Sequence, residues 1–134
     1  MSRLIISLMA VSLAIGGVAY ASAGDDQGSG VRAWAQVNPN DGSPLLVKTK
    51  GFVAVSSREA GVYCLRARPG INLVNSAPVA TQEVNLSTAL GLVTVRRAGV
   101  DTALCPLDEL QVTTWNVSST PTAIGGVAFD VVVP

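Results

Sequence analysis

The sequence FVAVSSREAGVYCLRAR, residues 52–68, decides the fold. Apolar and polar side chains alternate on both sides of the turn-forming segment Ser57–Gly61, which predicts two antiparallel strands joined by a tight turn. Tyr63 and Leu65 share one face of the second strand, whereas Arg66 lies on the other. Because burying an arginine is costly, we expect the face with Tyr63 and Leu65 to point into a core.

Further strand-like runs flank this hairpin and end at Gly, Pro, Asn or Ser turns. Strict alternation in the run 45–50 would place Lys48 and Lys50 on one face with Leu46. The segment 85–91 is ambiguous between one helical turn and a loop. With the hairpin, the runs predict an all-β chain, a single antiparallel, jelly-roll-like β-sandwich of seven or eight short strands. The flanking runs are residues 31–37, 45–50, 77–84, 92–97, 110–115 and 127–133.

The last of these runs is apolar on both faces. Its odd positions carry Val127, Phe129, Val131 and Val133, while Asp130 lies on the other face between small or apolar neighbours. A strand of this kind would promote aggregation at an open sheet edge. We therefore expect it inside a sheet, paired on both sides, with Phe129 in the core.

The N-terminus carries the pattern of a secretory signal peptide. A short positive start ending at Arg3 precedes an uncharged stretch, Leu4–Ala19, which is shorter than the ~20 residues of a spanning helix. Small residues follow, so cleavage is expected after Ala23, with Ala21 as second choice and a retained membrane anchor as the alternative. The expected organisation is a signal-peptide helix (1–23), a flexible lead (24–30) and one β-sandwich domain (31–134). The mature protein would be extracellular or in the periplasm or cell envelope, with no stable membrane span.

Export would bring the two cysteines, Cys64 and Cys105, into an oxidising compartment. They allow one intramolecular pairing, and their spacing lacks the CxxC pattern of redox or metal sites. We expect a structural disulfide. Since Cys64 lies on the arginine-bearing face of its strand, the bond should sit on the outer face or at the sheet edge.

Composition excludes several classes of function. The chain has no histidine, 13% charged residues and a formal net charge of zero. Histidine-dependent catalysis and metal binding are therefore excluded, and neutrality disfavours nucleic-acid binding. We expect no cofactor and no metal, and the segment 38–43 lacks the ligand spacing of a calcium loop. The acidic candidates for a carboxylate-dependent hydrolase are Asp101, Asp108, Glu109 and Asp130. Asp108 and Glu109 are adjacent, so on a strand they would point to opposite faces and could not act together.

Several short motifs resemble those of a loose group of small exported bacterial β-domains. They are a Gly-x-Tyr-Cys hairpin, a Val-Ala-Thr strand and a terminal strand with an inward Phe. The resemblance implies the fold class and export, and it implies no activity and no functional residue. The matching segments are Gly61–Cys64, Val79–Thr81, Leu92–Val95, Val112–Asn116 and Val127–Val133.

The distribution of charge suggests a possible binding patch. Basic residues predominate in residues 42–100, and after residue 100 every charged residue is acidic. The two halves could neutralise each other on one surface, or the basic side could bind a cell-envelope polymer or a second copy. Trp34 and Trp115 could stack on sugars, but sheet-face packing is the favoured interpretation in so aromatic-poor a chain. The candidate patch comprises Trp34, Arg66, Arg68, Arg96 and Arg97.

Together these features favour a non-catalytic exported binding, surface or structural module. Its expected partner is an envelope polymer, a surface protein or the protein itself. The alternative is a small secreted inhibitor that presents a turn such as Ser57–Gly61 to the cleft of a hydrolase. A carboxylate-dependent hydrolase is the third hypothesis.

Overall fold

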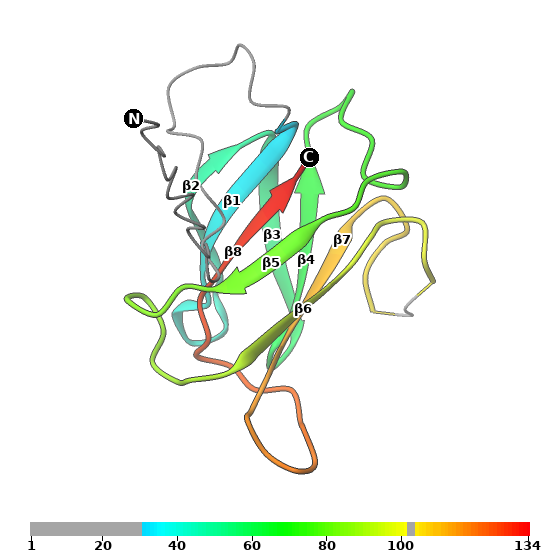
Figure 1. Ribbon diagram of the computed structural model, residues 1–134. Coiled ribbons are helices and arrows are strands. Elements are labelled where there is room, and N and C mark those ends of the chain that lie inside the picture. Colours follow the sequence, from blue (N-terminus) through cyan, green and yellow to red (C-terminus); the bar gives the residue numbers. More distant parts are fainter. Residues whose placement is uncertain (1–30, 102–103) are drawn as a thin grey trace, which may run out of the picture.

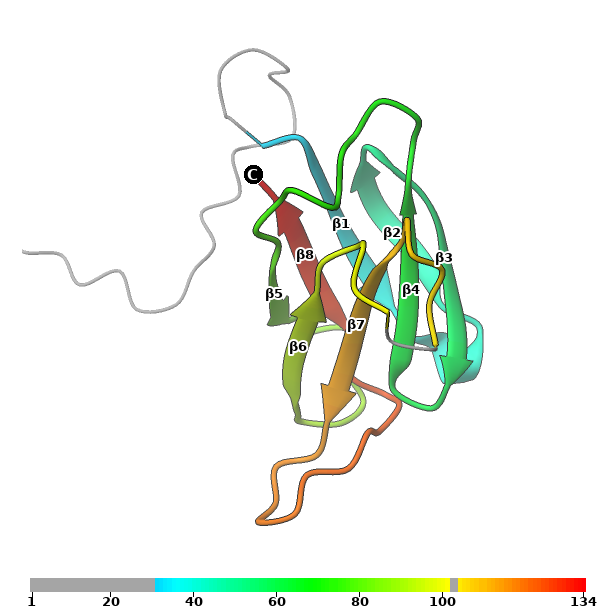
Figure 2. The same ribbon diagram turned by 90° about the vertical axis from the view of Figure 1, so that its right-hand side faces the viewer.

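The computed structural model describes residues 31–101 and 104–134, which form two four-stranded antiparallel sheets packed face to face (Figures 1 and 2). The first sheet has the strand order β2-β1-β8-β5 and the second β3-β4-β7-β6. The expected all-β sandwich is confirmed, whereas the predicted signal peptide (1–23) and lead (24–30) lie outside the described residues. The strands are β1 (Ala33–Asn38), β2 (Leu45–Lys50), β3 (Phe52–Glu59), β4 (Val62–Ala67), β5 (Val79–Gln82), β6 (Leu92–Arg96), β7 (Leu110–Trp115) and β8 (Phe129–Val133).

Period-two alternation builds the core between the sheets. In β1, Ala33, Ala35 and Val37 are buried, while the intervening side chains are partly exposed. The apolar side chains that face the opposite sheet are removed from water in one shared core, and this burial stabilises the sandwich. None of the described helical segments is long and apolar enough to cross a membrane.

The predicted hairpin is formed by β3 and β4, and a tight turn joins them. Gly61 in this turn has a φ of +79°, which favours glycine. A Cβ atom there would lie 2.6 Å from backbone atoms of Ile124, so the turn is packed against the chain that precedes β8. The turn therefore requires glycine both for its backbone conformation and for the close approach of a second segment.

The C-terminal strand lies inside the first sheet, as expected. β8 pairs with β1 on one side and with β5 on the other. Phe129 is fully buried, and its ring centroid lies 5.4 Å from that of Tyr63 in the opposite sheet.

The structure corrects one local expectation, the face of Leu46, and resolves another, the conformation of residues 85–91. β2 contains a bulge at Val47, so Leu46 pairs with Val37 and packs on the core, while Lys48 pairs with Gln36 on the outer face. The prediction that Leu46 shares a face with the lysines is wrong, because one extra residue reverses the alternation. The ambiguous segment 85–91 contains turns and loop and no helix.

Candidate functional site

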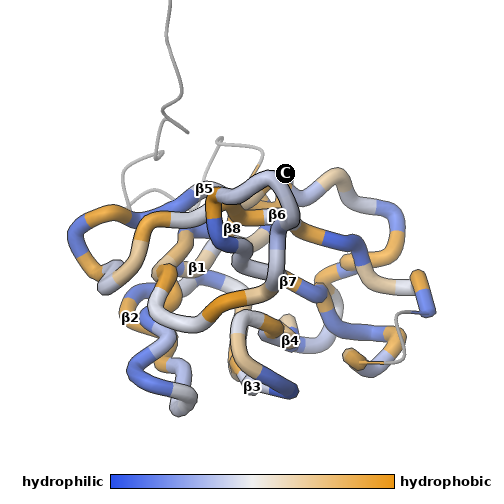
Figure 3. The backbone as a smooth tube through the Cα atoms, turned by 90° about the horizontal axis from the view of Figure 1, so that it is seen from below, coloured by the Kyte–Doolittle hydropathy of each residue, from blue (hydrophilic) through white to orange (hydrophobic). Residues whose placement is uncertain are grey.

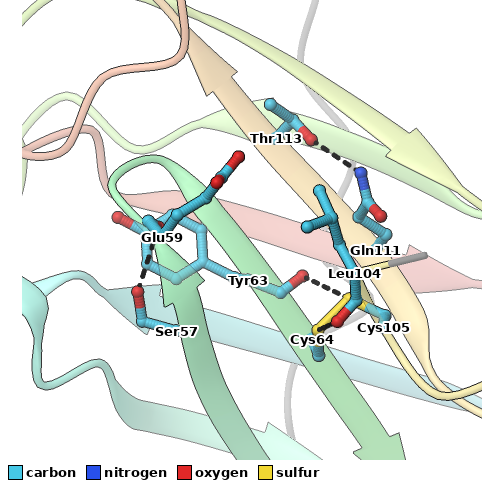
Figure 4. Close-up of a disulfide and its surroundings, with 8 residues drawn as sticks. All are labelled: Ser57, Glu59, Tyr63, Cys64, Leu104, Cys105, Gln111 and Thr113. Carbon is cyan, nitrogen blue, oxygen red and sulfur yellow. Dashed lines mark hydrogen bonds between the residues drawn. A yellow bond between two sulfur atoms is a disulfide. The ribbon is translucent and has the colours of Figure 1, made fainter. Parts of the chain in front are cut away.

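The disulfide joins β4 to the chain between β6 and β7, of which the structure describes residues 97–101 and 104–109; we call these described residues the flap. The Cα atoms of Cys64 and Cys105 are 5.6 Å apart, which confirms the predicted bond. The sulfur of Cys105 lies 3.7 Å from the carbonyl oxygen of Tyr63 (Figure 4). Cys64 is only 1% exposed although it points away from the core, so the flap covers this part of the outer face. The expected position on the outer face is confirmed.

The five residues of the predicted patch do not form one surface. Arg66 in β4 and Arg96 at the end of β6 point outward from the second sheet, and Arg68 and Arg97 follow these strands. All four arginines are exposed. Trp34 points outward from β1 in the first sheet and is partly buried. Because the outer faces of a sandwich look in opposite directions, Trp34 lies apart from Arg66 and Arg96.

The arginines share their end of the molecule with carboxylates. Asp101, Asp108 and Glu109 belong to the flap, which the disulfide holds against the same sheet. Leu110 pairs with Leu65, so the preceding Glu109 lies near Arg66. This end therefore carries mixed charge, and the acidic segment weakens its attraction for a polyanion. Asp130, the fourth acidic candidate, belongs to the first sheet and is 4% exposed.

The turn considered for an inhibitor, Ser57–Gly61, is anchored rather than projecting. The carbonyl oxygen of Gly61 accepts a hydrogen bond from the backbone N–H of Thr114 at 2.8 Å. The hydroxyl of Ser57 donates to the carbonyl oxygen of Glu59 at 3.2 Å (Figure 4).

A different surface lies at the other end of the strands, and sequence reasoning missed it. It consists of residues 84–92, between β5 and β6, and residues 115–128, between β7 and β8; we call it the neutral end. Neither segment contains a charged residue. The three most exposed large hydrophobic side chains of the described residues all belong to it: Leu90 at 73%, Val117 at 70% and Val84 at 62%. Figure 3 views the molecule from this end, with β5 and β6 on the side opposite β2 and β3.

The first part of the neutral end is a ribbon that projects beyond the strands, residues 115–123 (Figure 2). Trp115 and Ala123 form an antiparallel bridge, and the N–H of Asn116 donates to the carbonyl oxygen of Thr122 at 3.0 Å. The side-chain Oδ1 of Asn116 accepts from the N–H of Thr122 at 2.9 Å. These cross-ribbon bonds hold Val117 outward near the tip.

The second part, residues 84–92, is fastened to the chain below the ribbon. The backbone N–H groups of Thr88 and Ala89 both donate to the carbonyl oxygen of Gly126, at 2.7 and 3.1 Å. The hydroxyl of Ser87 accepts from the N–H of Ala128 at 2.9 Å. From the β5 side, the amide of Gln82 donates to the carbonyl oxygen of Ala89 at 3.1 Å. The two loops therefore form one braced surface.

Trp115 anchors the ribbon to the sheet. It is the cross-strand partner of Leu92, and its indole Nε1–H donates to the hydroxyl of Thr94 at 2.8 Å. The ring is partly buried, as expected for sheet-face packing, and Leu92 beside it is 54% exposed. These three side chains form a step next to the ribbon, which we call the ledge.

The sequence does contain a signal for this surface. Residues 84–95 and 110–129 contain no charged residue, although residues 4–24 and 69–82 are uncharged as well, so this signal alone does not single out the surface. What the sequence does not show is that both stretches meet at one end. Comparisons with protein-family models, with curated protein sequences and with solved structures found no match.

Proposed function

We propose that the protein is a non-catalytic exported module that binds a protein partner through its neutral end. The observation that carries this proposal is that Leu90, Val117 and Val84 are exposed on two adjoining segments that contain no charged residue. The nearest charges belong to Glu83, whose carboxylate accepts from the N–H of Asn85, and to Arg58 and Glu59 in the turn that packs against Ile124. Charge depletion at the centre of a patch distinguishes protein interfaces from ordinary surface, and clustered exposed apolar side chains mark interaction sites.

The energetics favour this surface over the arginine-bearing end. Covering apolar side chains contributes about 25 cal/mol per Å² removed from water, and residues 84–92 and 115–128 themselves add no charge that has to be desolvated. The bonds that Thr88, Ala89 and Asn116 make within the loops reduce the entropy lost on binding. At the other end, a partner of either charge would meet both arginines and carboxylates.

Export rests on two features of the chain. The sequence begins with a signal-peptide pattern that ends at Ala23. The disulfide between Cys64 and Cys105 suits an oxidising compartment.

Site-specific photo-crosslinking in secreting cells tests the proposal. A photoreactive side chain at Val117 should give an adduct with a defined protein. The matched control is Val53 in β3, which is 54% exposed and lies outside the neutral end. Equal labelling from both positions, or adducts only with polysaccharide from Val117, would contradict the proposal.

A further inference from the structure

We infer that Asn85 is a site of N-linked glycosylation, modified while the chain is exported. The donor is an oligosaccharide carried on a lipid pyrophosphate. The side-chain nitrogen Nδ2 of Asn85 forms a bond to the anomeric carbon of the first sugar, and the bond from that carbon to the pyrophosphate oxygen breaks. The lipid pyrophosphate leaves, and the amide gives up one proton to a base of the transferase. The inference shares with the proposed function the expectation of export, and it does not depend on a protein partner.

The acceptor sequence is the first argument. Residues 83–87 read Glu-Val-Asn-Leu-Ser, which contains the Asn-x-Ser/Thr pattern of N-glycosylation with no proline at its middle position. Bacterial oligosaccharyltransferases also require an acidic residue two positions before the asparagine, where a carboxylate can pair with an arginine of the enzyme. Glu83 occupies that position. A second Asn-x-Ser match begins at Asn116 and has Thr114 there instead, so only the first segment meets both requirements.

The place of Asn85 in the fold is the second argument. It lies in the loop between β5 and β6 (Figure 1). The N–H of Ser87 donates to the carbonyl oxygen of Val84 at 3.3 Å, so residues 84–87 form a turn with Asn85 at its corner. Asn85 is exposed, and its side-chain amide makes no hydrogen bond to another described residue. A glycan on Nδ2 would therefore extend into solvent without breaking a contact of the folded domain.

Asn116 differs from Asn85 in its structural setting as well as in its sequence. It is partly buried, and its Oδ1 accepts from the N–H of Thr122 at 2.9 Å and from the hydroxyl of Ser118 at 3.3 Å. These bonds fix the asparagine side chain across the ribbon and engage the serine hydroxyl of its own Asn-x-Ser match. The structure therefore favours Asn85 over Asn116 as the acceptor.

The hydrogen bonds of Ser87 indicate when the transfer takes place. In the folded domain its hydroxyl, which the transferase has to recognise, donates to the carbonyl oxygen of Glu83 at 2.6 Å and accepts from the N–H of Ala128 at 2.9 Å. Ala128 follows Ser87 by 41 residues, so the bond between them forms only after that much more chain has been made. At synthesis rates of about 5–20 residues per second, this interval is about 2–8 s. Transfer therefore precedes the docking of the segment before β8.

Export of the full-length chain from bacterial cells that carry a single-subunit oligosaccharyltransferase and its lipid-linked oligosaccharide tests the inference. The intact mass of the protein recovered outside the cytoplasm should increase by one glycan, and peptide mapping should locate the glycan at Asn85. Asn85→Gln should abolish the addition. Asn116→Gln, the matched control, should leave it unchanged. An exported wild-type chain without a glycan, or with its glycan at Asn116, would overturn the inference.

A substitution of Glu83 tests recognition of the carboxylate separately from its contact in the loop. The carboxylate accepts from the N–H of Asn85 at 2.9 Å, and Glu83→Gln keeps an oxygen that can accept this bond while it removes the charge. Initial rates of glycan transfer should fall by about tenfold, the effect of one charge-assisted hydrogen bond. Thermal unfolding should be unchanged. A transfer rate equal to that of the wild type would overturn the role that we assign to Glu83.

The outcomes separate this inference from the proposed function. An exported chain that lacks the glycan but gives a protein adduct from Val117 would overturn the glycosylation site alone. A chain with a glycan at Asn85 and no protein adduct from Val117 would overturn the proposed function alone. A chain that stays in the cytoplasm would contradict both, because both require export.

Discussion

Tyr63 and Phe129 pack ring to ring between the two sheets, with centroids 5.4 Å apart and planes inclined by 48°. This contact joins β4 of the β3–β4 hairpin to the C-terminal strand β8. Both rings are almost fully buried, at 2% and 0% exposure. The contact therefore links the last strand of the chain to a hairpin that lies earlier in the sequence by more than half the length of the domain.

Replacing Phe129 by alanine should strongly destabilise the domain. The substitution leaves a cavity between the sheets, and we expect the free energy of unfolding to fall by about 3–5 kcal/mol. Chemical denaturation followed by circular dichroism measures it. Val117→Ala is the control, because an exposed substitution should change stability by less than about 0.5 kcal/mol. A small effect of Phe129→Ala, or cooperative unfolding of a chain that lacks its last eight residues, would contradict the central position of β8.

Reduction of the disulfide should destabilise the domain and uncover part of the second sheet. The bond spans 41 residues, and closing a loop of this size contributes roughly 3–4 kcal/mol in the chain-entropy model. Hydrogen exchange should increase at Val62 and Thr113, which are 2% and 5% exposed on the face beneath the flap. The Cys64→Ala/Cys105→Ala double variant should have the same lowered stability and no response to reductant. Detection of two free thiols in the oxidised protein would contradict the prediction.

Stability should fall at alkaline pH because of Tyr63. Burial raises the pKa of its hydroxyl above the ordinary value of 10.0, and a hydrogen bond with Thr114 partly opposes this. As the folded state holds the proton more tightly than the unfolded state, the contribution is complete below pH 10 and is lost as pH rises through the folded-state pKa. Denaturation midpoints measured across this range should decline less steeply for Tyr63→Phe. Identical slopes for both proteins would be the contrary result.

Two glycine substitutions should separate backbone strain from overpacking. Gly61 and Gly70 both have positive φ, +79° and +93°. A Cβ at Gly61 meets the backbone of Ile124 at 2.6 Å, whereas nothing lies within 4 Å at Gly70. Gly61→Ala should therefore cost about 1–3 kcal/mol more than Gly70→Ala, the range for overpacking. Equal losses in thermal or chemical unfolding would show that the contact with Ile124 relaxes freely.

Export should remove residues 1–23. Intact-mass analysis of the protein recovered outside the cytoplasm is expected to show a chain that begins at Gly24, because small residues flank the bond after Ala23. Ala23→Arg should block this cleavage, since the processing site requires a small residue. A recovered chain that still contains Leu4–Ala19 would be inconsistent with a signal peptide.

The local pattern was sufficient for much of the fold. Alternation predicted which side chains of β4 face inward, and two cysteines in a chain that begins with a signal-peptide pattern predicted one disulfide. The doubly apolar run around Phe129 predicted an interior strand. These inferences succeed because the direction of a side chain along a strand and its preference for burial are set by the local sequence.

The tertiary structure decided what depends on register and on contacts between distant segments. One extra residue at Val47 moved Leu46 to the core, and the assignment of β1 to the first sheet separated Trp34 from the arginines. The neutral end exists because the carbonyl oxygen of Gly126 accepts bonds from Thr88 and Ala89, 38 residues from Thr88 in the chain. Strand pairing and loop contacts of this range are selected by the packing of the whole domain, and no local pattern of hydrophobicity or charge encodes them.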